Sequence, residues 1–348
     1  MREKVPQATQ RFSNSNSYKG HISSLLYACL FLLLLTACNN EHREKHKPHS
    51  IGELYEVLLI SDDKKTGDVM YEALNEAVAG LPQVENYFDV KRITTNQVNK
   101  HTQYSRSIIS INVDSSKYKK AELTYTKNTY AYPQTIISIN TPSAESLQKE
   151  VGKFMKKIKQ LIITQDNSTQ VQILTDNNNT KAKEDIETML KCFILIPPTL
   201  KYEKKGENFI WLSDKNPQCM KNICVYTYNG LDLTMDKVIE MRDSIMKENI
   251  PGQSEGMYMT TAPNTSSVSR TVYNNKSILV VKGLWEMEND AMGGPFITHS
   301  IVDSANNRVI TAEAFIYGPG EKKRDRMRRL EAALYTLNKL KDNKPANK

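Results

Sequence analysis

The chain has 348 residues, of which 39% are hydrophobic and 25% charged, and its formal net charge is +8. This composition excludes intrinsic disorder over most of the chain, and the length allows two domains of ordinary size. The part from residue 38 onward keeps a charge of only +5, and its basic residues lie among acids. We therefore expect no nucleic-acid-binding patch and interpret the basic run over residues 322–329 as a solvated helix face.

The first predicted element is a secretory signal peptide over residues 1–37. An uncharged run over residues 25–35 follows a basic, polar stretch. Its length suits the core of a signal peptide, whereas a transmembrane helix needs about 20 residues. The run leads into Leu35-Thr36-Ala37-Cys38, which resembles the lipobox of bacterial lipoproteins in all four places. This resemblance implies cleavage before Cys38 and a lipid on its thiol, so we predict a palmitate-bearing, membrane-anchored lipoprotein.

A tether is predicted over residues 38–50. It is polar, its charges alternate in sign, and it has almost no apolar side chain to bury, which is typical of a flexible segment. The spacing of His42, His46 and His49 would suit a metal, but such residues are common in polar tethers and we assign none. Asn39 is not the aspartate that retains some lipoproteins in the inner membrane. We therefore expect the outer membrane of the cell envelope, and we favour its periplasmic side.

The first folded unit is predicted over residues 51–165. Short apolar runs predict strands, and apolar residues at helical spacing predict one helix after the first strand and a long one that Ser143 caps. The strands are expected over residues 54–61, 88–93, 107–113 and 135–140, and the helices over residues 69–78 and 143–163. A polar stretch over residues 165–180 is expected to hold the domain boundary.

The second folded unit is predicted over residues 181–341. Several antiparallel-looking strands alternate with three helices, so the fold class of the chain is α+β, with two α/β-type units of which the second is an antiparallel sheet flanked by helices. The strands are expected over residues 209–213, 223–228, 277–285, 296–303 and 309–317, and the helices over residues 181–192, 234–248 and 321–340.

Cysteine and histidine residues suggest little chemistry. Cys219 and Cys224 are close enough in sequence to form a disulfide across a turn, and free buried cysteines are the alternative. His101 and His299 are the histidines left for a folded active site, and neither lies in a zinc-protease motif. The sequence also has no P-loop, no dinucleotide-binding glycine motif and no hydrolase nucleophile elbow. We therefore predict no cofactor and no metal.

The most distinctive stretch runs over residues 283–296. Three acids alternate after a tryptophan and precede Gly293-Gly294-Pro295-Phe296, so their carboxylates could share one face and bind a cation or the amines of a ligand. The simpler alternative is a polar hairpin whose glycines form the turn and whose aromatic residues belong to the core. The candidate binding surface comprises Trp285, Glu286, Glu288, Asp290, Gly293, Gly294 and Phe296.

Several motifs together resemble one family over about residues 51–341. The most specific are Gly283-Leu284-Trp285 with Met292-Gly293-Gly294-Pro295-Phe296, and Tyr317-Gly318-Pro319-Gly320 before Lys323-Arg324. They resemble domain of unknown function 4837, a family of Bacteroidota lipoproteins. The resemblance implies an envelope location and supplies no catalytic residue. The order of elements in the second unit is also similar to the Mog1/PsbP-type α+β fold.

The leading hypothesis is a non-enzymatic envelope module that binds a ligand or a partner protein. Its rival is a hydrolase of envelope glycans or peptides that uses Glu286, Glu288 and Asp290 as acid and base. The hydrolase requires at least two carboxylates in one cleft, one of them partly buried, whereas the binding module requires an open apolar surface. A structural assembly component, with exposed strand edges or a large apolar patch, is the third hypothesis.

Overall fold

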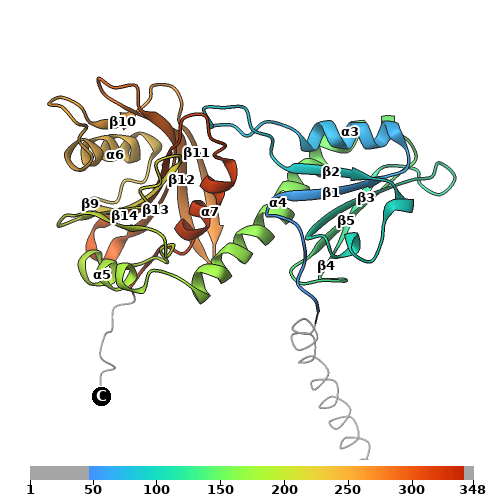
Figure 1. Ribbon diagram of the computed structural model, residues 1–348, viewed down its shortest axis with the longest axis horizontal. Coiled ribbons are helices and arrows are strands. Elements are labelled where there is room, and N and C mark those ends of the chain that lie inside the picture. Colours follow the sequence, from blue (N-terminus) through green and yellow to red (C-terminus); the bar gives the residue numbers. More distant parts are fainter. Residues whose placement is uncertain (1–46, 341–348) are drawn as a thin grey trace, which may run out of the picture. The chain divides into compact units, whose positions relative to one another are not determined.

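The computed structural model of the protein describes residues 47–340. The predicted signal peptide, most of the tether and the predicted lipidation residue Cys38 lie outside the described residues. From Ser50 onward the described residues belong to one compact unit, which contains a five-stranded and an eight-stranded sheet (Figure 1). The predicted boundary between two domains therefore stays a prediction. Among the described residues, no helix is long and apolar enough to cross a membrane.

The first sheet is mixed and has the strand order β2-β1-β3-β5-β4. Its strands are β1 (Glu56–Ser61), β2 (Asp89–Ile93), β3 (Ser107–Val113), β4 (Glu122–Lys127) and β5 (Thr135–Thr141). Neighbouring strands are parallel except β4, which runs antiparallel to β5 at one edge. The apolar runs that predicted β1, β3 and β5 supply the core against α3 (Lys64–Leu74) and the first half of α4 (Ala144–Asp176).

The helix α4 is longer than the sequence predicted. The polar residues that suggested a loop from residue 165 onward are helical as far as Asp176, and Gln165, Asp166 and Asn167 are buried. Their side chains accept hydrogen bonds from the Thr135 hydroxyl (2.6 Å), the Tyr55 amide (2.8 Å) and the Tyr55 hydroxyl (3.4 Å), respectively. Polar residues therefore attach this turn of α4 to the first sheet instead of ending the helix.

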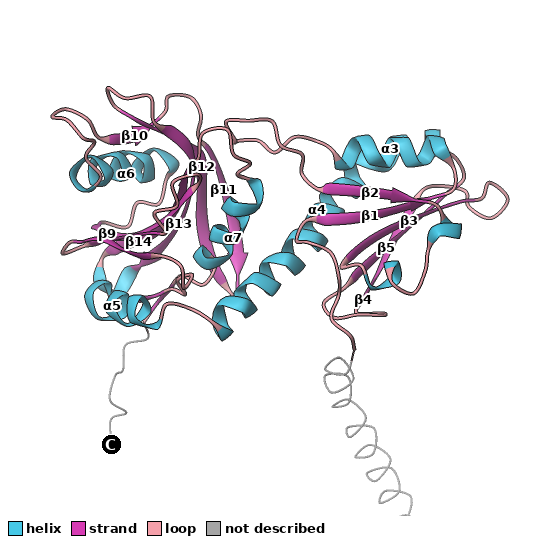
Figure 2. Ribbon diagram, in the orientation of Figure 1, coloured by secondary structure: helices cyan, strands magenta, loops and turns pink. Residues whose placement is uncertain are grey.

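The second sheet is antiparallel throughout, with the order β10-β12-β13-β14-β9-β8-β7, and β11 also pairs with β12 (Figure 2). Its strands are β7 (Lys201–Lys205), β8 (Phe209–Ser213), β9 (Met220–Asn229), β10 (Met259–Thr261), β11 (Ser267–Tyr273), β12 (Lys276–Met287), β13 (Gly293–Asp303) and β14 (Arg308–Tyr317). The helices are α5 (Thr180–Leu190), α6 (Met235–Asn249) and α7 (Arg324–Leu334), and β6 (Cys192–Phe193) pairs with β15 (Asn338–Lys339). The predicted α+β class with an antiparallel second sheet is confirmed.

The two faces of the second sheet bury separate apolar cores. On one face α5 and α7 pack against the sheet, and on the other α6 packs against the aromatic residues of β8, β9, β12, β13 and β14. Alternation of side chains along each strand sends successive residues to opposite cores. The last predicted helix is shorter than expected, because α7 ends at Leu334 and the chain then forms β15.

A fully buried ion pair joins α6 to the second sheet. The guanidinium of Arg242 donates to both carboxylate oxygens of Glu313 on β14, at 2.8 to 3.1 Å, and its Cζ atom lies 4.0 Å from the ring centroid of Phe296. Neither member of the pair is exposed. Removing one partner of such a pair leaves a buried charge without compensation, which is far more destabilising than removing both partners.

We therefore expect Glu313→Gln to lower the free energy of unfolding by about 3–5 kcal/mol. The double variant Arg242→Met, Glu313→Leu should lose less, since it leaves no buried charge. Urea unfolding followed by circular dichroism measures both values. A double variant less stable than the single variant would contradict this account.

Asp166 in α4 supplies a second buried charge. Burial raises the pKa of its carboxyl to about 6, although the Tyr55 amide and the cations Arg106 and Arg328 act in the opposite direction. Its Oδ1 has no hydrogen-bond partner among the described residues. Because the folded-state pKa lies above the ordinary value of 3.8, the folded state binds a proton that the unfolded state has already lost between these two pH values.

The contribution of Asp166 to the free energy of unfolding should therefore fall by roughly 3 kcal/mol at most as the pH rises from about 4 to about 6. Asp166→Asn keeps an acceptor for the Tyr55 amide and removes the charge. We expect this variant to be more stable than the parent above pH 7 and to have a flatter stability profile between pH 4 and 6. Urea midpoints across this pH range test the sign, and a less stable variant at pH 7.5 would refute it.

Candidate functional site

The apolar members of the predicted binding surface belong to the core. Trp285 on β12 is 2% exposed, and its indole N–H donates to the carbonyl of Ile316 at 3.2 Å. Phe296 on β13 is 1% exposed and lies beneath the Arg242 guanidinium. The prediction of an open apolar surface at these residues is therefore wrong, because both rings face the core beneath α6.

The acids of the same stretch point outward. Glu286, Glu288 and Asp290 are exposed, while Trp285 before them and Met287 among them are buried. Alternation along the end of β12 thus separates carboxylates from rings, as expected for a strand with one buried face. None of the three lines the pocket described below. The arrangement does not provide the partly buried pair of carboxylates in one cleft that the hydrolase hypothesis requires.

Gly293 and Gly294 lie in β13 and not in the turn that the sequence predicted. A Cβ on Gly293 would lie 2.9 Å from the carbonyl oxygen of Trp285, and a Cβ on Gly294 would collide with the carbonyl oxygen of Ile316. Glycine is therefore needed at both positions for close approach of neighbouring strands, which is a packing role.

Of the two alternatives for Cys219 and Cys224, a disulfide or free buried thiols, the structure has the second. Both thiols are free and buried. Cys219, next to the start of β9, belongs to the core beneath α5 and α7, whereas Cys224 belongs to the core beneath α6. Residues five apart along an extended chain point to opposite faces of a sheet, so these two sulfurs cannot meet without disrupting β9.

The site that the structure does build begins at the N-terminus of α7. Lys323 occupies the N-cap position but provides no side-chain cap. Instead, the carboxylate of Glu85, from the segment between α3 and β2, accepts the backbone N–H groups of Lys323 (2.6 Å) and Arg324 (3.1 Å). Glu85 is 8% exposed. An anion at this end satisfies amides that a helix leaves unpaired and complements the helix dipole.

Two arginines one helical turn apart extend this contact. Arg324 donates to the Asn86 carbonyl (2.6 Å) and to the carboxylates of Asp89 and Asp325, and these partners raise the pKa of Arg324 despite its burial. Arg328 lies 4.3 Å from the ring centroid of Tyr55 and 4.7 Å from that of Tyr87.

The expectation of a solvated helix face over residues 322–329 is therefore wrong in part. Arg324 is 6% exposed and Arg328 7% exposed, so the run includes the residues that attach α7 to the first sheet.

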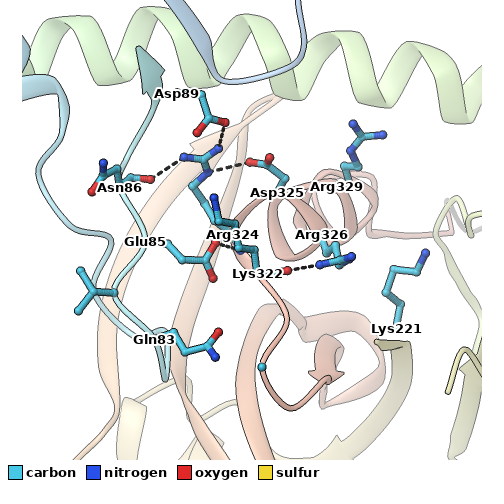
Figure 3. A pocket seen from close by; sticks show the side chains of 12 residues that line it. Gln83, Glu85, Asn86, Asp89, Lys221, Lys322, Arg324, Asp325, Arg326 and Arg329 are labelled. Atoms are coloured by element: carbon cyan, nitrogen blue, oxygen red, sulfur yellow. Dashed lines mark hydrogen bonds and ion pairs between the residues drawn. The ribbon is translucent and has the colours of Figure 1, made fainter. Parts of the chain in front are cut away.

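A basic pocket of about 870 Å³ lies beside these contacts (Figure 3). Its lining comes from residues 83–89, from residues 320–329 and from β9. Five cationic side chains line it against three carboxylates, and this volume is within the range of small-molecule sites. The cations are Lys221, Lys322, Arg324, Arg326 and Arg329, and the acids are Glu85, Asp89 and Asp325.

The cations of the basic pocket differ in how firmly they are held. Arg324 is fixed by three partners. Arg326 pairs with Glu321 at 3.1 Å and Arg329 with Glu53 at 3.6 Å, and in both pairs the two side chains are substantially exposed. Exposed pairs of this kind contribute little stability. Lys322 is exposed as well. Several positive charges can thus turn toward a ligand at little energetic cost.

A second group of titratable side chains surrounds His299. His299 is fully buried, its Nε2 lies 3.8 Å from Glu331, and burial lowers its pKa. Burial opposes ionisation of Glu331, but Lys282 and His299 hold its pKa at about 2. A carboxylate with so low a pKa is a weak base at neutral pH, so this group is poorly suited to acid–base catalysis. His101 is exposed and lies in a different segment, before β3.

Metal binding has no structural support among residues 47–340, where no group of three or more His, Cys, Asp or Glu side chains is placed to hold an ion. Of the tether histidines, His42 and His46 lie outside the described residues.

Comparison with solved structures gives weak likenesses. A mutant of protein Mog1 is 9% identical, with a TM-score of 0.29 over 44% of this chain and 92% of that chain. The Ran-binding protein Mog1p of Saccharomyces cerevisiae is 8% identical, with a TM-score of 0.28 over 43% and 90%. The lipid transfer and protein localization domain of human StarD13 is 12% identical, with a TM-score of 0.19 over 45% and 90%. The predicted Mog1-type similarity is found, at scores too low to carry an argument about function.

Comparison with curated proteins gives no match. Two family models match successive parts of the chain, and both describe domains of unknown function. Residues 50–175 match DUF8532 and residues 179–336 match DUF4837. The predicted resemblance thus holds for residues 179–336, while residues 50–175, which it was also expected to cover, match a different family model. Residues 179–336 of the chain are therefore similar to the family of the domain of unknown function DUF4837.

Proposed function

We propose that the protein is a lipid-anchored component of the cell envelope whose folded part binds an anionic ligand in the basic pocket. One observation carries the binding proposal: five cationic side chains, against three carboxylates, line a single cavity of about 870 Å³. A phosphorylated or multiply carboxylated molecule is the ligand class that such a lining favours.

Arg326 and Lys322 are the side chains best placed to contact such a ligand. The guanidinium of Arg326 donates to the Lys322 carbonyl and to Glu321, an exposed acid that a ligand can replace. A planar guanidinium binds phosphate or carboxylate through two parallel hydrogen bonds, which gives orientation as well as affinity. Arg324 and Glu85 are instead assigned a structural role, since their partners are other parts of the fold.

The location is proposed from the sequence. The match of Leu35-Thr36-Ala37-Cys38 to a lipobox supports attachment through Cys38, and Asn39 favours the outer membrane, periplasmic side. Several acyl chains on one cysteine would make the anchor stable. No specific observation favours the hydrolase, because its three candidate carboxylates are exposed and lie outside the pocket.

Inorganic pyrophosphate is a suitable first probe for the basic pocket. We expect it to bind at low ionic strength, and Lys322→Gln with Arg326→Gln to weaken binding roughly tenfold or more, since each charge-assisted hydrogen bond contributes about 1.5–3 kcal/mol. Titration calorimetry measures the affinity. Lys149→Gln, an exposed lysine on α4 that does not line the pocket, is the matched control. An equal loss of pyrophosphate affinity in the double variant and in the Lys149→Gln control, or no binding by the parent protein, would reject the pocket as the binding site.

The anchor has an equally simple test. Cys38→Ser should leave the leader uncleaved and the N-terminal peptide without diacylglycerol, as read by mass spectrometry of the protein from the native envelope. Cys29→Ser makes the same change within the apolar core of the leader and should leave processing intact. Normal lipid modification of the Cys38→Ser protein would show that the proposed lipobox is not the site.

A further inference from the structure

Exposed tyrosines gather at one place on the first sheet. Four tyrosines are largely exposed among the described residues, and three of them lie within eight positions: Tyr125 (45%), Tyr130 (48%) and Tyr132 (43%). We call these three the tyrosine patch. Tyr125 belongs to β4, which has no further strand on its outer side, and the other two follow in the loop to β5. None of the three belongs to the buried core, although the Tyr125 ring also lies 5.5 Å from the Nζ atom of Lys157 on α4.

The tyrosine patch lies where the folded part of the chain begins. The amide of Ser50 donates to the carbonyl of Tyr132 at 3.0 Å, and the amide of Ile51 donates to that of Tyr104 at 2.9 Å. Lys127, at the end of β4, pairs with Thr135, at the start of β5. The patch is thus fixed beside the residue that connects the folded part to Cys38.

Chain length limits how far this end can lie from an anchored lipid. Eleven residues lie between Cys38 and Ser50, and a fully extended chain over this span of twelve steps reaches at most about 40 Å. A flexible chain of the same length has a typical end-to-end distance of roughly 20 Å. If Cys38 carries the lipid, the patch is therefore confined to the neighbourhood of the bilayer surface.

The chemistry of the patch suits the headgroup layer. A tyrosine ring has an apolar body and a polar hydroxyl, which is the combination that concentrates at membrane–water interfaces. Residues 123–134 also contain Lys127 and no acid, so the segment has a net positive charge. Basic residues near a membrane surface are attracted by anionic lipids.

We propose that the tyrosine patch, with Lys127, rests in the anionic headgroup layer of the membrane to which the chain is anchored. This inference depends on the proposed lipid anchor at Cys38 and is independent of the basic pocket. The contact would hold the first sheet against the bilayer, so that the anchored protein has a defined orientation instead of rotating freely on its tether.

The experiment is hydroxyl-radical footprinting of the mature lipoprotein in vesicles of phosphatidylcholine and phosphatidylglycerol. Oxidation of Tyr130 and Tyr132 is compared with that of Tyr71, an exposed tyrosine on α3 that serves as an internal reference. We expect the ratio of Tyr130 and Tyr132 oxidation to Tyr71 oxidation to fall several-fold in vesicles. The ratio should recover when nonionic detergent dissolves the vesicles. Unchanged ratios in a protein that carries its lipid would overturn this inference and leave the anchor standing.

Matched charge reversals separate membrane contact from other causes of protection. Lys127→Glu should restore most of the oxidation in vesicles, whereas Lys149→Glu, at an exposed position early in α4, should not. Protection that survives detergent and rises with protein concentration would indicate a second copy of the chain as the occupant and would overturn the proposal. An N-terminal peptide without lipid would overturn both the anchor and the patch.

Discussion

The contact between α7 and the segment from Glu85 to Asp89 is the interaction on which the rest of the structure depends. α7 packs one face into the core of the second sheet and presents Arg324 and Arg328 to residues that belong to the first sheet or precede it. Arg324 and Arg328 are four residues apart, so helical spacing places them on the same face of α7, away from its apolar face. Glu85 completes the contact by accepting hydrogen bonds from the first backbone N–H groups of α7. The start of α7 and the position of the segment between α3 and β2 are therefore determined together.

The same contact creates the basic pocket. Burying Arg324 and Arg328 requires partners for their charges, and Asn86, Asp89, Asp325 and two tyrosine rings provide them. Arg326 and Arg329 of the same segment pair instead with Glu321 and Glu53, and the side chains of both pairs are substantially exposed. The fold thus sorts one run of cations into two groups. Buried cations hold the parts of the chain in place, while the exposed cations Arg326 and Arg329 make ion pairs that contribute little stability.

Hydrophobic periodicity was sufficient to predict the main strands of both sheets and the positions of α5 and α6. It did not identify the site, because contacts distant in sequence decide whether a polar residue is buried. The run over residues 322–329 looks like a solvated face until Tyr55, Tyr87 and Asp89 are placed against it. Gln165 and Asp166 look like loop residues until the start of β1 supplies a donor for Asp166. Trp285 and the neighbouring glycines looked functional because unusual residues cluster there, whereas close packing of strands is what requires them.

The carboxyl groups with a raised pKa lie in the core and not at the basic pocket. One kind of general acid or base at neutral pH is a carboxyl whose pKa is raised and which a substrate can reach. Among the described carboxyl groups, Asp166 and Glu313 are those with a raised pKa, and both are fully buried, one beneath the Tyr55 amide and the other against Arg242. The three acids of the hydrolase hypothesis, Glu286, Glu288 and Asp290, are exposed. They lie at the end of β12 or just after it, and they do not line the basic pocket. The described carboxyl groups with a raised pKa are therefore out of a ligand's reach, whereas exposed positive charge and accessible space coincide in the basic pocket, which is what the proposed anion binding requires.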